Sequence, residues 1–218
     1  MFLYLASNSP RRRQLLGLTG LDFQVAAAEV DETPLPGEAP KAYVLRLAEE
    51  KARAAVKAMA NGRLRPPGLV LAADTTVVED GTTILGKPSD PEDAAAVLRR
   101  LRGNVHEVLT AIALLRMQDG ALVKDVCVTQ VPMRAYSEEE IQAYVASGDP
   151  LDKAGSYAIQ HAGFHPVENL QGCFANVMGL PLCLLASLLR RLGVDPGEHI
   201  PAACQQGLEY ACPIPEKV

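Results

Sequence analysis

The chain has 218 residues, of which 48% are hydrophobic, and its net charge is −5. This length suits one large domain or two small lobes that share a core, and no apolar run approaches the roughly 20 residues that cross a bilayer, so we expect no membrane partner. The acidic balance argues against a nucleic-acid polymer as main partner, because proteins with that role usually carry a positive surplus.

The N-terminal segment places hydroxyl and basic side chains at the expected start of a helix. A strand over residues 2–6 is followed by SNSPRRR and by a helix over residues 10–19, whose first turn suits Pro10. Unpaired N–H groups and the helix dipole attract an anion there, and the serines and three arginines add donors that match phosphate. Because three arginines at this end oppose the dipole unless an anion offsets them, the segment predicts a phosphate-binding loop. The alternative is an ordinary N-cap before a solvated first turn.

Strands and helices alternate along the rest of the chain. The first predicted elements are a strand over 23–28, a helix from 41 to about 61, a buried strand over 69–74, and a second strand that turns at 80–81 and returns. A helix over about 90–102 follows, and then two long strands within 106–135 that are joined by a turn at 119–120. The last elements are a helix that follows the N-cap Ser137, with Glu140 completing a capping box, a strand over 157–160, and an amphipathic helix over 180–193. Segment 163–179 and the tail from residue 194 are expected to be irregular. This pattern predicts an α/β protein with a mixed, strongly twisted sheet flanked by helices, in two lobes around a cleft.

The five cysteines are odd in number and widely spaced, and no two form a CxxC pair. A zinc site and a disulfide framework are therefore not expected. A reducing compartment is the default for such a chain, and the N-terminus lacks the charged region and cleavage pattern of a secretory signal. We expect a cytoplasmic protein.

Asp74 is the most informative candidate outside the N-terminal segment. It ends the apolar strand LVLAAD, where the interior is expected to meet a cleft. A carboxylate in that position can hold Mg²⁺ or activate water. It can equally cap a turn through Thr75 or Thr76.

The other polar candidates carry little weight one by one. They are Glu32 in an acidic loop, Lys51 among the charges of the long helix, Lys87 before a proline, and Asp152, Lys153 and Gln160 in DKAGSYAIQ. A solvated loop and a helix surface are the ordinary settings for such residues. The chain contains no GxSxG, HExxH or GxGxxG pattern.

Taken together, the segments resemble one family. SNSPRRRQLL, VDE, RLAEEKARA, LAADTTVV, ILGKP, LRRLRGNVHEVLTAIAL, PLDKAGSYAIQ and VMGLPL follow the order and spacing of the Maf-like nucleotide pyrophosphatases. The resemblance covers about residues 2–193. It implies a Maf/ITPase-like domain over 1–193, followed by a tail over 194–218. It also implies a homodimeric, metal-dependent hydrolase that cuts a nucleoside triphosphate between its α and β phosphates, with Mg²⁺ or Mn²⁺ as the cofactor.

The resemblance also assigns roles to individual residues. Asp74 corresponds to the presumed catalytic base, and Glu32 and Asp74 would hold the metal. The remaining matched positions are assigned to the substrate: Ser7, Arg11, Arg12, Lys51, Thr75, Lys87 and Gln160. One carboxylate does not easily serve both as a tight metal ligand and as a free base, so both roles stay open for Asp74.

Three positions resemble the branch of the family that acts on dTTP and UTP. These are Arg11 directly after Ser-Pro, Thr75 after the aspartate, and the Tyr-x-Ile-Gln pattern that ends at Gln160. The branch that acts on 7-methyl-GTP typically has an aromatic residue in place of the arginine and lacks the glutamine. An amide suits the O4/N3–H edge of uracil or thymine because it both donates and accepts. The stretch HAGFHPVENLQGCFAN departs from the usual glycine turn and hairpin of the family.

Two other classes of function stay open. A nucleotide-sensing regulator of cell division and septum formation would need the binding residues but not the carboxylates that hold a metal and activate water. A single-stranded RNA-binding module is disfavoured by the acidic charge and by the absence of tryptophan.

Overall fold

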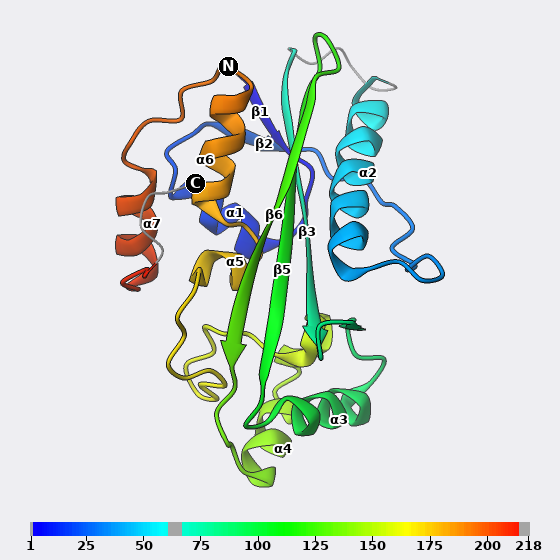
Figure 1. Ribbon diagram of the computed structural model, residues 1–218, viewed down its shortest axis with the longest axis vertical. Helices are drawn as coiled ribbons and strands as arrows, with labels where there is room; N and C mark the ends of the chain where they lie inside the picture. The colour runs from blue at the N-terminus through cyan, green and yellow to red at the C-terminus, as the bar shows by residue number, and fades with distance from the viewer. Residues whose placement is uncertain (1, 61–66, 214–218) are drawn as a thin grey trace.

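A mixed β-sheet runs through the length of the molecule (Figure 1). The computed structural model describes residues 2–60 and 67–213, and within them the sheet has six strands in the order β2-β1-β3-β5-β6, with β4 pairing β3. The strands are β1 (Phe2–Leu5), β2 (Phe23–Val25), β3 (Gly68–Glu79), β4 (Thr83–Leu85), β5 (Val105–Arg116) and β6 (Leu122–Pro132). β1 is parallel to β2 and β3, whereas β5 is antiparallel to β3 and β6.

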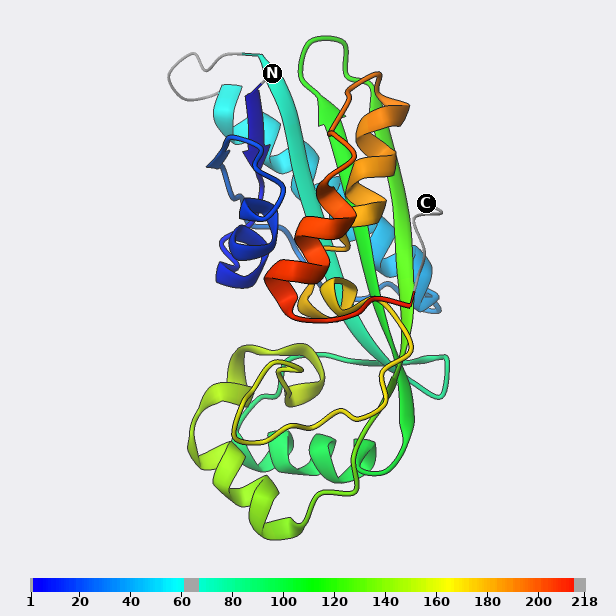
Figure 2. The same ribbon diagram turned by 90° about the vertical axis from the view of Figure 1, so that its left-hand side faces the viewer.

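Helices cover both faces of the upper part of the sheet. The helices are α1 (Pro10–Gly17), α2 (Pro40–Ala60), α3 (Pro91–Leu101), α4 (Glu138–Ala146), α5 (Phe174–Met178), α6 (Leu182–Arg191) and α7 (Ile200–Leu208), with 3₁₀ turns at Asp149–Asp152 and Ala154–Ser156. Helix α2 packs on one face, and α1, α5, α6 and α7 lie on the other (Figure 1). Helices α3 and α4 form a lower lobe around the far ends of the long strands (Figure 2). The predicted α/β class with a mixed sheet flanked by helices is therefore confirmed.

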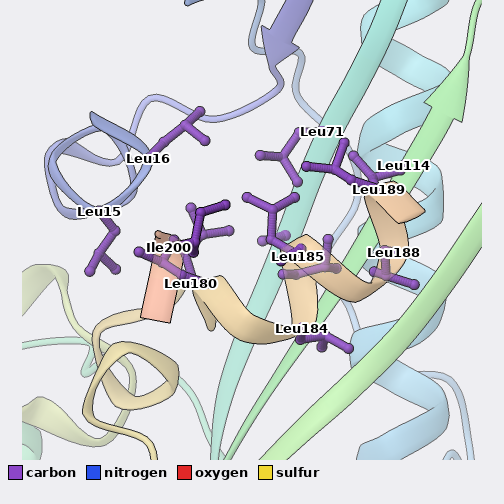
Figure 3. Close-up of a cluster of buried hydrophobic side chains, with 14 of the residues drawn as sticks. Leu15, Leu16, Leu71, Leu114, Leu180, Leu184, Leu185, Leu188, Leu189 and Ile200 are labelled. Carbon is purple, nitrogen blue, oxygen red and sulfur yellow. The ribbon is translucent and has the colours of Figure 1, made fainter. Parts of the chain in front are cut away.

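Leucine side chains build the core under α6. Leu185, Leu188 and Leu189 of α6 face Leu71 of β3 and Leu114 of β5, and all five are fully buried (Figure 3). Burying a leucine contributes roughly 1.5–3 kcal/mol, so this cluster fixes α6 and its neighbours firmly on the sheet.

The locally encoded elements match their predictions. The Ser137 hydroxyl accepts from the Glu140 amide at 3.2 Å, and the Glu140 carboxylate accepts from the Ser137 amide at 2.7 Å, which completes the predicted capping box. The long hairpin of β5 and β6 is also confirmed.

Five predicted elements differ from the structure. Residues 174–178, within the segment expected to be irregular, form α5, which begins after the N-cap Cys173. Residues 69–79 form one continuous strand, since β5 pairs with β3 from Leu69 to Val78. The second strand ends at Val25 rather than at residue 28. Residues 157–160 form a loop and turn instead of a strand, and the Ala158 amide donates to the Tyr144 hydroxyl at 2.9 Å. The tail contains α7, which is anchored by the fully buried Ile200.

Candidate active site

All the predicted site residues meet at one cavity of about 1010 Å³. Its walls come from the loop after β1, the middle of β3, the start of the acidic loop, and the segment around residues 149–162. The predicted residues that line it are Ser7, Arg11, Arg12, Glu32, Lys51, Asp74, Thr75, Lys87 and Gln160. The topology thus brings together positions that are far apart in the sequence.

A gap between two strands exposes the middle of β3 to this cavity. β1 pairs with β3 only as far as Leu5 opposite Leu71, with a last bond from the Ala6 amide to the Leu71 carbonyl at 2.8 Å. β4 begins to pair on the same strand at Val77. Asp74 lies in the interval, so it reaches the cavity from mid-strand, and the prediction that it ends a strand is wrong.

The loop after β1 enters α1 as predicted. The Ser9 hydroxyl is the N-cap and accepts from the Arg12 amide at 3.4 Å, with Pro10 in the first turn. The Ser7 hydroxyl, which is buried, accepts from the Ser9 amide at 3.2 Å. These bonds hold the start of α1 at the rim of the cavity, where its dipole favours an anion.

Arg12 is held in a fixed orientation by three different elements. Its Nε donates to the Gly179 carbonyl at 2.9 Å, Nη1 to Ser7 Oγ at 3.3 Å and Nη2 to Thr75 Oγ1 at 3.0 Å. A guanidinium has five N–H donors, so two are left to face a ligand in the cavity. Burial lowers the pKa of Arg12, and the negative charge of Asp74 opposes that shift.

The hydroxyls of Thr75 and Thr110 form a hydrogen-bonded chain that supports Arg12. The Thr110 hydroxyl donates to the Asn176 carbonyl at 2.9 Å, and since it has only one proton, the 2.9 Å contact between Thr75 and Thr110 must have Thr75 as its donor. Arg12 then donates to Thr75. The Thr75 proton is therefore used within the protein, and the Thr75 hydroxyl orients Arg12.

Asn176 and Thr110 are fully buried, and the Asn176 amide also donates to the Val108 carbonyl and to Thr129 Oγ1, each at 2.9 Å. Neither residue is predicted from the sequence. A threonine in an apolar strand and an asparagine in an irregular segment carry no local signal of such a contact.

One ammonium joins the two candidate carboxylates. Lys51 Nζ lies 2.6 Å from Asp74 Oδ1 and 2.6 Å from Glu32 Oε1. The Asp74 side chain is 8% exposed and that of Glu32 is 52% exposed. The Tyr43 hydroxyl donates to the Glu32 carbonyl at 2.8 Å and so fixes the acidic loop beside α2.

The two carboxylates are shifted in opposite directions. Burial raises the pKa of Asp74 above its ordinary value, although Lys51 and Arg12 oppose this. Burial also acts to raise the pKa of Glu32, but the hydrogen bond and charge of Lys51 outweigh it, so the pKa of Glu32 is lowered. Such a divergence is the usual arrangement where one carboxylate acts as a base and the other stays ionised.

The far wall of the cavity carries the predicted base-reading residue. Gln160 is exposed on a turn at the rim. Lys153, which also lines the cavity, is only 8% exposed, and its Nζ lies 3.0 Å from Asp149 Oδ1 and 2.7 Å from Asp152 Oδ1. The Tyr144 hydroxyl donates to Asp149 at 2.6 Å, so this wall is held by a network of ion pairs and hydrogen bonds.

A family model described as "Maf-like protein" matches residues 2–192. The chain belongs to the Maf-like family.

Three relatives of this Maf-like protein are each named "dTTP/UTP pyrophosphatase". The relative from Dechloromonas aromatica is 48% identical over 90% of this chain and 100% of its own length. The relative from Anaeromyxobacter dehalogenans (strain 2CP-1 / ATCC BAA-258) is 49% identical over 88% of this chain and 94% of its own. The relative from Geobacter sulfurreducens is 47% identical over 88% of this chain and 96% of its own. A solved structure titled "The structure of the Staphylococcus aureus Ham1 protein" matches with a TM-score of 0.47 and 15% identity, covering 78% of this chain and 81% of that chain.

Asp74 and Glu32 are the residues of this Maf-like protein that could help to hold a divalent cation. Over residues 2–60 and 67–213 there is no group of three or more His, Cys, Asp or Glu side chains that could hold a metal ion. Two carboxylates, Asp74 and Glu32, nevertheless contact the same Lys51 ammonium. Mg²⁺ is commonly held by one or two carboxylates together with substrate phosphates and water, and this pair supplies that number.

Two cations of this Maf-like protein stay available for phosphate. Arg11 and Lys87 line the cavity, and neither forms an ion pair with any residue that the structure describes.

No helix in the described ranges is long and apolar enough to cross a membrane.

Proposed function

We propose that this Maf-like protein is a nucleoside triphosphate pyrophosphatase that hydrolyses dTTP and UTP to the monophosphate and pyrophosphate, a nucleotide-pool house-cleaning reaction. The names of relatives at 46–49% identity support the reaction and the substrates. The observation that carries the proposal is the pairing of Asp74 and Glu32 through Lys51 beside a phosphate-binding loop, inside one cavity.

The phosphate chain of the substrate binds along the cationic wall. The N-terminus of α1, the remaining donors of Arg12, and the cations Arg11 and Lys87 surround about four negative charges. Charge-assisted hydrogen bonds of this kind are about twice as strong as neutral ones. They also stabilise the charge that develops on the leaving pyrophosphate.

Asp74 would accept a proton from the attacking water. Its raised pKa makes it a stronger base than an ordinary carboxylate, and burial keeps bulk water away from it. Glu32, whose pKa is lowered, stays ionised and keeps the Lys51 ammonium in place. Mg²⁺ or Mn²⁺, held by Glu32 and the substrate phosphates, or by Asp74 as well where Asp74 is a ligand instead of the base, would supply further neutralisation of the triphosphate charge.

Base choice is assigned to the opposite wall. The Gln160 amide can donate to O4 and accept from N3–H of uracil or thymine. Because Gln160 is exposed on a turn, its side chain can reach a base that lies over the cavity. We include in the proposal a homodimer, which rests on the resemblance to the family, and a cytoplasmic location, which rests on the cysteine pattern.

Product analysis in ¹⁸O-labelled water tests the reaction. We expect UTP with Mg²⁺ to give UMP and pyrophosphate, with the label in UMP, because water attacks the α phosphorus. Label in the pyrophosphate would overturn attack at that atom, and formation of UDP and orthophosphate would overturn the function.

The Asp74→Asn variant tests the proposed base. It should bind UTP and melt as the wild type does, but its turnover should fall by at least about a hundredfold. Asp22→Asn, which changes an exposed carboxylate that does not line the cavity, is the matched control. An Asp74→Asn enzyme that keeps more than about a tenth of kcat would remove Asp74 from this role.

A further inference from the structure

His161 lines the nucleotide cavity on the same wall as Gln160. It is partly buried, and it opens the stretch HAGFHPVENLQGCFAN, which departs from the usual pattern of the family. No step of the proposed reaction uses its imidazole. Because it stands beside the residue assigned to the base, it is a candidate for a second contact to the nucleotide.

The backbone and the ring of His161 are both held in place. The His161 amide donates to the Ala158 carbonyl at 3.1 Å, and its carbonyl accepts from the His165 amide at 3.0 Å. The ring packs edge-on against Tyr144, with the ring centroids 4.7 Å apart. Tyr144 is itself fixed, because its hydroxyl donates to Asp149 at 2.6 Å and accepts from the Ala158 amide at 2.9 Å. The imidazole is therefore preorganised at the cavity wall, so that little ordering is left for a ligand to impose.

A hydrogen bond within the chain assigns the proton of the imidazole to one ring nitrogen. Nδ1 of His161 accepts from the Phe164 amide at 3.0 Å, so Nδ1 carries no proton. The single proton of the neutral ring is then on Nε2, which makes Nε2 a donor. Within residues 2–60 and 67–213, Nε2 has no hydrogen-bond partner. One N–H of His161 is therefore left for a ligand in the cavity.

The other side-chain donors on this wall are already engaged within the protein. Lys153 donates its three protons to oxygens of the two aspartates that precede it. The Tyr157 hydroxyl lies 2.8 Å from Nε2 of the buried His106. Of the cavity-lining side chains on this wall, all of which the structure describes, only Gln160 and His161 keep a donor for a ligand.

A pyrimidine that is bound by Gln160 still has one carbonyl oxygen without a partner. Uracil and thymine carry O4, N3–H and O2 in a row, and the Gln160 amide is assigned to O4 and N3–H. O2 is an acceptor, so it needs a donor, and the carboxylates of this wall cannot supply one. Purines have no carbonyl oxygen beside the glycosidic nitrogen. A donor for O2 therefore separates pyrimidines from purines.

We propose that His161 is a specificity-determining residue, whose Nε2–H donates to O2 of the pyrimidine while Gln160 reads O4 and N3–H. The contact is to an oxygen that uracil, thymine and cytosine share and purines lack, so it favours pyrimidines as a class. This inference rests on the proposed function.

Two variants separate the ligand contact from a structural role of His161. Asparagine places an acceptor close to the position of Nδ1 and has no atom at the position of Nε2, whereas glutamine places an amide donor near Nε2. His161→Asn should keep the bond from the Phe164 amide and lower kcat/KM for UTP roughly five- to thirtyfold, and His161→Gln should lose less. His165→Asn changes an exposed histidine of the same segment that does not line the cavity, so it is the matched control and should match the wild type.

Thiolated substrates identify the oxygen that is contacted. Sulfur is a weak hydrogen-bond acceptor, so kcat/KM of the wild type should be roughly five- to thirtyfold lower for 2-thio-UTP than for UTP, and His161→Asn should treat the two alike. 4-Thio-UTP changes the atom assigned to Gln160 and should lose the same factor in both enzymes. The comparison of UTP with 2-thio-UTP on the wild type needs no variant, so it stands even if both His161 variants unfold.

Three results would overturn the proposal. These are a wild type that hydrolyses 2-thio-UTP as efficiently as UTP, a His161→Asn enzyme that keeps the wild-type kcat/KM, and a His161→Gln enzyme that loses at least as much as His161→Asn. If the wild type hydrolyses no nucleotide, the proposed function fails by itself, and calorimetric binding of UMP to the wild type and to His161→Asn tests the contact separately. Equal affinities for UMP, including no binding by either protein, contradict it.

Discussion

Replacing Lys51 by methionine removes the ammonium that joins the two carboxylates. Its Nζ lies 2.6 Å from each of them, and the Lys51 side chain is only 13% exposed. Methionine keeps much of the apolar length of lysine and removes the charge. Asp74, which burial already shifts, then loses its strongest source of stabilisation as an anion.

The size of the effect follows from this geometry. An opposite charge within about 4–6 Å lowers the pKa of a carboxyl by roughly 1–3 units, so Lys51→Met should raise the pKa of Asp74 by about that amount. At about 1.4 kcal/mol per unit, the free energy of unfolding at pH 7 should fall by about 1.4–4 kcal/mol. A carboxyl whose pKa is raised by folding gains stability as the pH falls through that pKa, so the deficit should shrink in acid.

The assay is the pH profile of kcat/KM for UTP, together with urea denaturation at pH 7 and pH 5. The acid limb of the profile should move to higher pH by about 1–3 units in Lys51→Met. Lys51→Arg keeps the charge and should move it less, and Lys57→Met, which changes an exposed lysine on the same helix, should not move it. An unchanged acid limb in Lys51→Met, with UTP turnover measurable, would refute the coupling of Asp74 to Lys51.

Three further perturbations address the support of Arg12, base choice and acid stability. Thr110→Val leaves the Asn176 carbonyl and the Thr75 hydroxyl without their partner, so the KM for UTP and the Ki for tripolyphosphate should both rise roughly 5–30-fold, for about 1–2 kcal/mol, with rescue by Thr110→Ser. A loss of thermal stability alone would argue against the positioning of Arg12. Gln160→Glu replaces an amide donor by an acceptor facing O4 of the base. The fall in kcat/KM for UTP should correspond to about 1–3 kcal/mol of activation free energy. An unchanged kcat/KM for UTP would remove Gln160 from base recognition. Burial lowers the pKa of His106 to about 4, so the contribution of the neutral imidazole to stability is lost as the pH falls below 6.5. Urea denaturation between pH 6.5 and pH 5 should show the wild type losing about 2 kcal/mol more free energy of unfolding than His106→Gln. An equal loss of free energy of unfolding in both proteins would contradict this.

The parts of the site that are encoded locally could be predicted from the sequence. The loop before α1 is one example, because Ser9, Pro10 and Arg12 lie within one helical turn of each other. The capping box at Ser137 is another. The long hairpin follows from two apolar runs and a short turn, and those contacts are also close in the sequence.

The parts that depend on distant contacts could not be predicted. Asp74 looks like the end of a strand because polar residues follow it, yet β5 continues to pair beyond it and makes it a mid-strand residue. Thr110 and Asn176 carry no local signal, since their role arises only when α5 packs against β5. The tail looks loose by composition, but Ile200 fills a site in the leucine core that only the folded chain creates.

The most direct test of the central claim is a panel of pyrophosphate-release rates for UTP, dTTP, GTP and 7-methyl-GTP with Mg²⁺ and with Mn²⁺. We expect kcat/KM for UTP or dTTP to exceed that for GTP and 7-methyl-GTP by at least about tenfold, because the site is proposed to fit a pyrimidine and the purine ring system is larger. A purine or 7-methyl-GTP optimum would contradict the substrate assignment, and the absence of pyrophosphate release from every nucleotide would contradict the enzymatic function itself.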